Sequence, residues 1–402
     1  MREGAWREGN AAPVGQPVPG YRVAVRIAFL NWRDTANPEG GGSEVYIEEI
    51  AQRLVERGHE VTLVCAAHGN SPGLEVRPGP GEARPGLRII RRGTKLTVYR
   101  EARRLLRSGA LGPLDVIVDT QNGIPFFAPW ATRTPVVVLV HHVHREQWPV
   151  VYDPLRARVG WLLESRLAPR VYRRSAYVAV SQATADELVA LGVDRARIHV
   201  IHNGTRDPGV AHGDRDTNPR ILVLGRLVPH KRVEHVLAAA ARLRARFPAL
   251  RIAVVGDGWW APRLREVAQE LGVADLVEFT GHVTDERKER EIDRSWVLAL
   301  PSLKEGWGLV VLEAAARGVP AVAYRDAGGV TESIVDGRTG LLVSGGETEF
   351  TDALERVLAD ESLLRDLGEA ARVHARQFSW DESSMEFDEV LMRAAREARR
   401  RD

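Results

Sequence analysis

Two glutamates in the second half of the chain, Glu305 and Glu313, stand where carboxylates could meet a bound sugar. They belong to the segment K-E-G-W-G-L-V-V-L-E, which follows an apolar run over Trp296–Leu300 that predicts a buried strand. A helix is expected from Leu309 to Arg317, because a glycine and then a proline follow it. One carboxylate can accept hydrogen bonds from sugar hydroxyls and the other from a ribose. The alternative is a solvated loop with two surface glutamates.

Two glycines leave the turn between this strand and this helix without side chains. At Gly306 and Gly308 a ligand could approach backbone N–H groups. The N-terminus of the following helix carries a partial positive charge and unpaired donors, which suit a phosphate group.

Arg226 and Lys231 follow another apolar run, Leu222–Leu224, and its exit glycine, Gly225. Two fixed cations beyond a strand end can neutralise the charge that grows on a diphosphate leaving group. Lysine is rare in this chain: among 56 Lys and Arg residues only Lys95, Lys231, Lys288 and Lys304 are lysines. A lysine is therefore unusual here, where a compact point charge fits better than a planar fork. The alternative is an ordinary exposed turn.

Three consecutive glycines, Gly40, Gly41 and Gly42, precede an expected helix over Ser43–Arg57, so their amides could approach a phosphate. Ser43 and Glu44 are expected to open that helix as its cap and its first acidic residue. Neither this run nor Gly256-Asp-Gly258 has the G-x-G-x-x-G spacing of dinucleotide-binding enzymes. The alternative for the glycine run is a flexible surface turn.

Three histidines, His141, His142 and His144, follow the apolar run Val136–Val140. They suggest zinc, but no cysteine or clear carboxylate partner has metal-ligand spacing, so we expect no metal there. Asp214-Arg-Asp216 matches a metal motif of other sugar-transferring enzymes. It lies in a polar segment rather than at a strand end, and we interpret it as solvated charge.

With these segments together, the chain resembles the family 4 retaining glycosyltransferases, which have the GT-B fold. The resemblance extends from about Val25 to the C-terminal helix. Its motifs are G-G-G-S-E at Gly40–Glu44, the histidine at His141, V-S-Q-A-T at Val180–Thr184, I-H-N-G at Ile201–Gly204, G-R-L-x-x-x-K at Gly225–Lys231, V-V-G-D-G at Val254–Gly258, F-T-G-H-V at Phe279–Val283 and E-x7-E at Glu305–Glu313.

The resemblance implies metal-independent, front-face transfer of a sugar from a UDP- or GDP-linked donor to a hydroxyl acceptor. His141 would contact the donor sugar, Arg226 and Lys231 the diphosphate, Glu305 the sugar hydroxyls and Glu313 the ribose. The nucleobase of the donor would lie near His282 and Val283 and would contact mainly the backbone there. The other expected donor contacts are Gly41, Gly42, Gly225, Gly256, Gly306, Trp307, Gly308 and Leu309. Those expected on the acceptor side are His142, His144, Arg145, Glu146 and Trp148.

Strands and helices alternate along the chain, which predicts an α/β protein with parallel sheets. The expected strands are Val25–Leu30, Glu60–Cys65, Arg88–Arg91, Asp115–Asp119, Pro135–Val140, Tyr177–Val180, Arg220–Leu224, Arg251–Val255, Leu276–Thr280, Trp296–Leu300 and Ala321–Tyr324. We expect two Rossmann-like domains that face each other across a cleft. The expected division is a disordered leader (1–20), an acceptor-side domain (21–202), a linker (203–219), a nucleotide-sugar domain (220–378) and a C-terminal helix that packs back on the first domain (379–402).

Bulk properties agree with a cytoplasmic enzyme that needs no nucleic acid. The 402 residues suffice for two domains, and the formal net charge is only +2. Cys65 is the only cysteine, so no intrachain disulfide can form and a reducing compartment is expected. No apolar run reaches the length of a membrane span, and the first twenty residues lack the apolar core of a signal peptide.

The acceptor could be a small molecule, a glycan or a lipid-linked molecule. The basic amphipathic segment Leu155–Arg174 would be useful for a lipid-linked acceptor. Such a helix can lie on anionic lipid, which would place the protein at the inner membrane face. The favoured interpretation is that it packs one face and solvates the other. Two rival functions remain for the whole chain: a nucleotide-sugar epimerase and a nucleotide-sugar-binding protein without catalysis.

Overall fold

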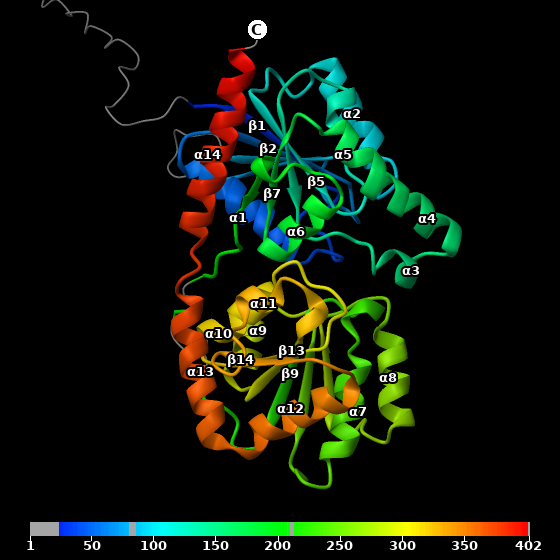
Figure 1. Ribbon diagram of the computed structural model, residues 1–402, viewed down its shortest axis with the longest axis vertical. Helices are drawn as coiled ribbons and strands as arrows, with labels where there is room; N and C mark the ends of the chain where they lie inside the picture. The colour runs from blue at the N-terminus through cyan, green and yellow to red at the C-terminus, as the bar shows by residue number, and fades with distance from the viewer. Residues whose placement is uncertain (1–23, 80–85, 207, 210–212, 401–402) are drawn as a thin grey trace, which may run out of the picture.

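The protein consists of two α/β domains stacked along its long axis (Figure 1). The computed structural model describes residues 24–79, 86–206, 208–209 and 213–400, so the expected leader lies outside the described residues. One domain is built on a sheet of eight strands and the other on a sheet of six. The α/β class and the two parallel sheets predicted from the sequence are confirmed.

The first sheet has the strand order β3-β4-β2-β1-β5-β6-β7-β8. All its pairings are parallel except that of β3 with β4. Its central strands, such as β6 with the sequence V-V-V-L-V, are buried along their whole length, as in sheets covered on both faces. The strands are β1 (Arg26–Leu30), β2 (Glu60–Cys65), β3 (Leu74–Arg77), β4 (Leu87–Arg91), β5 (Val116–Gln121), β6 (Val136–Val140), β7 (Ala176–Ala179) and β8 (Ile198–Val200).

The second sheet is parallel throughout, in the order β11-β10-β9-β12-β13-β14. Its strands are β9 (Arg220–Leu224), β10 (Arg251–Val255), β11 (Val277–Gly281), β12 (Val297–Leu300), β13 (Ala321–Tyr324) and β14 (Gly340–Val343). The order reverses direction between β9 and β12, so the loops after these two strands lie side by side. Ligands of open α/β sheets bind at such a switch point.

Helices connect the strands and cover the sheets. They are α1 (Gly42–Glu56), α2 (Val98–Ser108), α3 (Trp148–Val151), α4 (Pro154–Leu162), α5 (Ala168–Val171), α6 (Gln182–Ala190), α7 (Glu234–Leu243), α8 (Ala261–Glu270), α9 (Asp285–Asp293), α10 (Leu309–Ala316), α11 (Val330–Ser333), α12 (Glu347–Ala359), α13 (Glu361–Ala375) and α14 (Trp380–Arg399). None of the helices within the described residues is long and apolar enough to cross a bilayer.

The last helix, α14, leaves the second domain and runs along the first, as predicted (Figure 1). Phe387 on this helix is fully buried and stacks on Phe29 of β1, with ring centroids 6.0 Å apart. Asp388 pairs with His59 at 3.2 Å, and both side chains are buried. At the start of α14 the chain meets the segment between the domains, where the Thr205 amide donates to the Phe378 carbonyl at 3.0 Å.

The sequence did not predict three strands, β3, β8 and β14. The first is a four-residue edge strand whose side chains alternate between exposed and half-buried. β8 has three residues, and β14 has four and begins with a glycine. Short strands of this kind depend on pairing with a neighbour, which local sequence does not reveal.

Candidate active site

Two helix N-termini face each other across the boundary between the domains. A Cβ atom built on Gly42, at the start of α1, would lie 3.6 Å from Leu309 Cβ, at the start of α10. A Cβ atom on Gly41 would lie 3.5 Å from Arg226 Nε. Two positive helix ends and a guanidinium group therefore converge on one place, which favours an anion there.

The glycine loop before α1 is held by a fully buried carboxylate. Glu44 accepts the Gly41 N–H at 2.7 Å and Arg33 Nε at 3.2 Å. Burial alone would raise the pKa of Glu44, but the charges of Arg33 and Arg226 and the Gly41 donor hold it below its ordinary value. The expectation that Ser43 caps α1 is wrong: Gly41 is the N-cap residue, because its extended backbone allows Glu44 to reach its amide.

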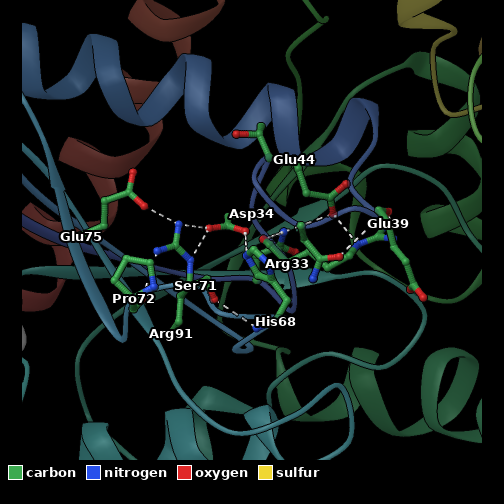
Figure 2. A network of polar contacts seen from close by, with 12 residues as sticks. Arg33, Asp34, Glu39, Glu44, His68, Ser71, Pro72, Glu75 and Arg91 are labelled. Atoms are coloured by element: carbon green, nitrogen blue, oxygen red, sulfur yellow. Dashed lines mark hydrogen bonds and ion pairs between the residues drawn. The ribbon is translucent and has the colours of Figure 1, made fainter. Parts of the chain in front are cut away.

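A second buried network lies next to this loop (Figure 2). Asp34 is fully buried and accepts Arg91 Nε at 2.7 Å, while His68 Nε2 lies 3.0 Å from its other oxygen. Arg91 also reaches Glu75, at 2.6 Å. The network ties the loop after β1 to β3 and β4, so the loop is fixed from both sides. None of these four residues was expected at the site from the sequence.

Both predicted cations follow β9, and one of them, Lys231, meets a predicted carboxylate that follows β12. Lys231 Nζ lies 2.5 Å from Glu305 Oε1, so the switch point brings together residues 74 positions apart in the sequence. Next to them, burial lowers the pKa of His230 to about 3, and the charges of Lys231 and Arg226 add to the effect. This local positive field is the electrostatic environment that a diphosphate requires.

Gly256, expected to contact the donor, has a packing reason to be glycine. A Cβ atom there would lie 2.1 Å from the Gly225 carbonyl oxygen. The loops after β9 and β10 thus touch backbone to backbone, and the Gly225 amide donates to the Val255 carbonyl at 3.0 Å. This contact fixes the loop that carries Arg226.

His141 lies where the first domain contacts the second. Its carbonyl oxygen accepts Thr184 Oγ1 at 3.1 Å and would lie 2.1 Å from a Cβ atom on Gly306 of the other domain. Its ring meets Tyr46 edge to face, with centroids 5.4 Å apart. Burial lowers the pKa of His141 to about 4, so the ring is neutral at pH 7, and its Nε2 is buried without a hydrogen-bond partner in the described structure.

Polar contacts between the domains surround this close approach. Glu332 on α11 accepts the N–H groups of Gln182 and Ala183, at 2.9 and 3.0 Å, which are the first two amides of α6. Lys304 pairs with Glu187 on the same helix. The N-terminus of α6 is therefore capped by a carboxylate from the other domain.

Trp307, expected at the donor, is buried beside these contacts rather than in an open cavity. Its ring stacks on His202 with centroids 4.3 Å apart and meets Phe378 edge to face. The indole ring is therefore part of the packing at the domain boundary.

On the predicted acceptor side, one buried carboxylate that the sequence analysis missed positions two expected residues. Glu164 accepts Trp148 Nε1 at 2.7 Å and the His144 amide at 3.1 Å, and His144 Nδ1 also lies 3.1 Å from it. It lies in a π-helical turn over Leu163–Leu167, a distortion often found at functional sites. The residues around Glu164 in the sequence give no indication of this role, since they are mostly arginines and leucines.

The remaining acceptor-side residues lie around this group. His142 Nε2 is 3.1 Å from Gln147 Oε1, and Arg145 lies over the ring of Trp161. Within the described residues, no three His, Cys, Asp or Glu side chains are arranged to hold a metal ion.

A cavity of about 840 Å³ opens between the domains. Four of the predicted donor residues line it: Gly41, His282, Leu309 and Glu313. His141, Arg226, Lys231 and Glu305 do not, although Arg226 adjoins it through Gly41. Glu313 Oε1 lies 2.8 Å from Lys288 Nζ, a pairing that the sequence did not predict.

Known families match the chain in succession. The profile described as Glycosyltransferase Family 4 matches residues 40–208, and that described as Glycosyl transferases group 1 matches residues 210–374. A D-inositol 3-phosphate glycosyltransferase of Nocardia farcinica is 30% identical, over 88% of this chain and 86% of that protein.

The chain belongs to the family 4 glycosyltransferases.

Another relative of this glycosyltransferase is a GDP-mannose-dependent alpha-(1-6)-phosphatidylinositol monomannoside mannosyltransferase of Mycolicibacterium smegmatis. It is 30% identical over 90% of this chain and 97% of that protein.

Solved structures show the same fold. A sucrose-phosphate synthase from Thermosynechococcus elongatus has a TM-score of 0.76 at 20% identity, over 92% of this glycosyltransferase and 98% of that chain. HepE of Anabaena in complex with UDP-glucose has a TM-score of 0.69 at 20% identity, over 92% and 99%. The two-domain fold is therefore GT-B, as the sequence predicted.

The backbone contact at Gly306 generates a prediction about this glycosyltransferase. In Gly306→Ala the new methyl group would collide with the His141 carbonyl, so we expect the domains to separate. Turnover should fall about a hundredfold, since misplacement by about 1 Å can have that effect. Small-angle scattering should show a larger radius of gyration. Gly213→Ala is the control, because no heavy atom lies within 4 Å of that position. A normal rate together with an unchanged radius would contradict the expectation.

Proposed function

We propose that this enzyme transfers a hexosyl group from a nucleotide diphosphate sugar to a hydroxyl acceptor, with retention of anomeric configuration and without a metal ion. One observation carries the proposal: the N-termini of α1 and α10, Arg226 and Lys231 together supply the positive charge that a departing diphosphate needs. Glu305, His141 and Glu313 keep the roles expected from the family resemblance.

The pairing of Glu305 with Lys231 supports retention without a covalent intermediate. A double-displacement mechanism needs a free carboxylate nucleophile and a separate acid. Here Glu305 is held by an ammonium group, and the pKa of His141 is too low for it to act as an acid at neutral pH. In the proposed step the bond between the anomeric carbon and the diphosphate oxygen breaks while the acceptor oxygen bonds to the same face. The acceptor proton passes to the departing phosphate oxygen.

The names of relatives guide the choice of substrates. Inositol phosphates and phosphatidylinositol mannosides are the acceptors to test first, with GDP-mannose and UDP-linked sugars as donors. Dependence on the acceptor also separates this function from an epimerase, which would convert the donor with no acceptor present.

The proposal predicts the stereochemistry and the metal requirement of the reaction. With an α-linked donor, the product should show an α-linkage by NMR. The rate should be the same in excess chelator and in magnesium, because Arg226 and Lys231 neutralise the leaving group. A β-linked product would rule out retention. Loss of turnover in chelator, restored by magnesium or manganese, would rule out metal independence.

The two cations can be tested separately from the fold. Lys231→Met and Arg226→Met should each lower kcat about a hundredfold, since one such contact stabilises a transition state by roughly 2–4 kcal/mol. Arg251→Met is the matched control. Arg251 is exposed and is the first residue of β10, so it lies at the opposite end of the strand from these loops. Chemical unfolding of all three variants checks that the domains stay folded. Near-normal turnover in both cation variants would remove the diphosphate assignment.

A peripheral membrane contact is the second part of the proposal. The apolar residues that the sequence placed in Leu155–Arg174 mostly pack inward: Trp161 and Leu167 contact the core, and Tyr172 is buried. Three others stay exposed on α4, spaced along one face: Leu155 at 72%, Val159 at 50% and Leu162 at 58%. Exposed arginines lie between and after them in the sequence, namely Arg156, Arg158, Arg166, Arg170, Arg173 and Arg174. An apolar strip among cations fits an anionic lipid surface.

Vesicle flotation tests this contact. We expect binding to vesicles that contain phosphatidylglycerol and weak binding to pure phosphatidylcholine. Replacing Leu155, Val159 and Leu162 together by serine should abolish it, whereas Val373→Ser, which is equally exposed on α13, should not. Unchanged flotation of the triple variant would show that α4 is only a solvated helix.

A further inference from the structure

The short helix α11 and the glycines before it hold the loop that carries Glu305. The Glu305 amide donates to the Ala327 carbonyl at 2.7 Å, and the Gly329 amide donates to the Glu305 carbonyl at 3.1 Å. Ser333 Oγ, at the end of α11, donates to the Trp307 carbonyl at 2.9 Å. The backbone of the loop is therefore bonded to both ends of this segment.

The loop and α11 are also packed tightly against each other. A Cβ atom on Gly329 would lie 1.9 Å from the Gly306 carbonyl oxygen. A Cβ atom on Gly308 would lie 3.3 Å from Val330 Cγ1. Close-packed segments transmit displacements to each other, so a shift of α11 shifts the loop with it.

Glu332 joins α11 to the first domain. Each of its oxygens accepts one amide at the start of α6, Gln182 N–H at 2.9 Å and Ala183 N–H at 3.0 Å. His202, in the segment between the domains, lies 3.2 Å from Oε2 and stacks on Trp307. Burial acts against the charge, but His202 and the two amides hold the pKa of Glu332 below its ordinary value. The carboxylate is therefore ionised at neutral pH and attracts the positive end of α6.

A second bond connects the same loop with the same helix. Lys304, the neighbour of Glu305 in the sequence, is buried and pairs with Glu187 on α6. The loop is thus connected to α6 directly through Lys304 and, through α11, by Glu332. These bonds fix the position of the loop relative to the first domain.

We propose that Glu332 is a positioning residue for sugar transfer, which sets the place of Glu305 relative to the first domain through α11. The inference rests on the proposed function, in which Glu305 and His141 both contact the donor sugar. Without Glu332 the loop keeps its fold and loses its place, and a misplacement of about 1 Å can lower a rate about a hundredfold. The nucleotide contacts proposed for Arg226 and Glu313 remain, because both residues belong to the second domain, as α11 does.

Kinetics, calorimetry and hydrogen exchange of Glu332→Ala test the proposal. We expect kcat to fall about ten- to a hundredfold. The affinity for free GDP or UDP should change by less than about threefold, because the bond acts on the placement of the sugar contact. The amides of residues 304–309 should exchange faster than in the unchanged enzyme. Glu332→Gln keeps one oxygen that can accept an amide, so its kcat should lie between the two. Glu266→Ala, exposed on α8, is the control and should change none of these quantities.

A second variant separates the bond between the domains from simple capping of α6. Glu332→Ala also removes the acceptor of two α6 amides, which lowers stability by itself. Adding Ala183→Glu to this variant supplies a carboxylate to the first turn of α6 from within the first domain. We expect the protection of the α6 amides and the unfolding midpoint to return, while kcat and the exchange of residues 304–309 stay as in Glu332→Ala. Recovery of kcat in the double variant would show that Glu332 only caps α6, and would overturn the proposal.

Two other results would also overturn it: an unchanged kcat in Glu332→Ala, or a loss of diphosphate affinity equal to the loss of kcat. Absence of transfer by the unchanged enzyme with every donor and acceptor tested would contradict the proposed function instead. The exchange of residues 304–309 would then still decide whether Glu332 positions the loop.

Discussion

The arrangement of the whole site depends on one close contact, between the backbone of Gly306 and the carbonyl group of His141. Only a residue without a side chain permits this approach, and it brings the loop after β12 onto the end of β6. Glu332 and Lys304 can then reach α6, and the N-termini of α1 and α10 can face each other. Residues of the candidate site from both domains can act together only when this surface is closed.

The glycine loop before α1 is surrounded by balancing negative charges. A site that concentrates positive charge needs fixed negative groups nearby, or its own loops would repel one another. Glu44 supplies one beneath Gly41, and Asp34 supplies another beside Arg91 (Figure 2). Removing one partner from such a buried pair typically costs 3–5 kcal/mol, because the other charge is left unpaired. The loop is therefore held in place before any donor arrives.

The sequence predicts those strands and site residues that a short local pattern marks. Apolar runs marked eleven of the strands to within one or two residues, and Arg226, Lys231, Glu305 and Glu313 stood out because they follow such runs. What it missed depends on contacts between distant residues. Glu164 is recognisable only beside His144 and Trp148, and Arg33 and Asp34 only in their buried pairs. The rarity of lysine was a usable signal for Lys288, but its partner Glu313 is 25 residues away and on another element.

The passages between the domains have a mechanical consequence. The chain goes from the first domain to the second after β8 and returns before α14, and the two passages are hydrogen-bonded to each other where Thr205 meets Phe378. Two chain segments joined side by side would restrict any rotation of the domains to a defined axis, whereas a single linker would leave their orientation free. Any rotation of the domains about this axis would move the rim of the cavity more than the side near Thr205, and the return would place α10 opposite α1 again.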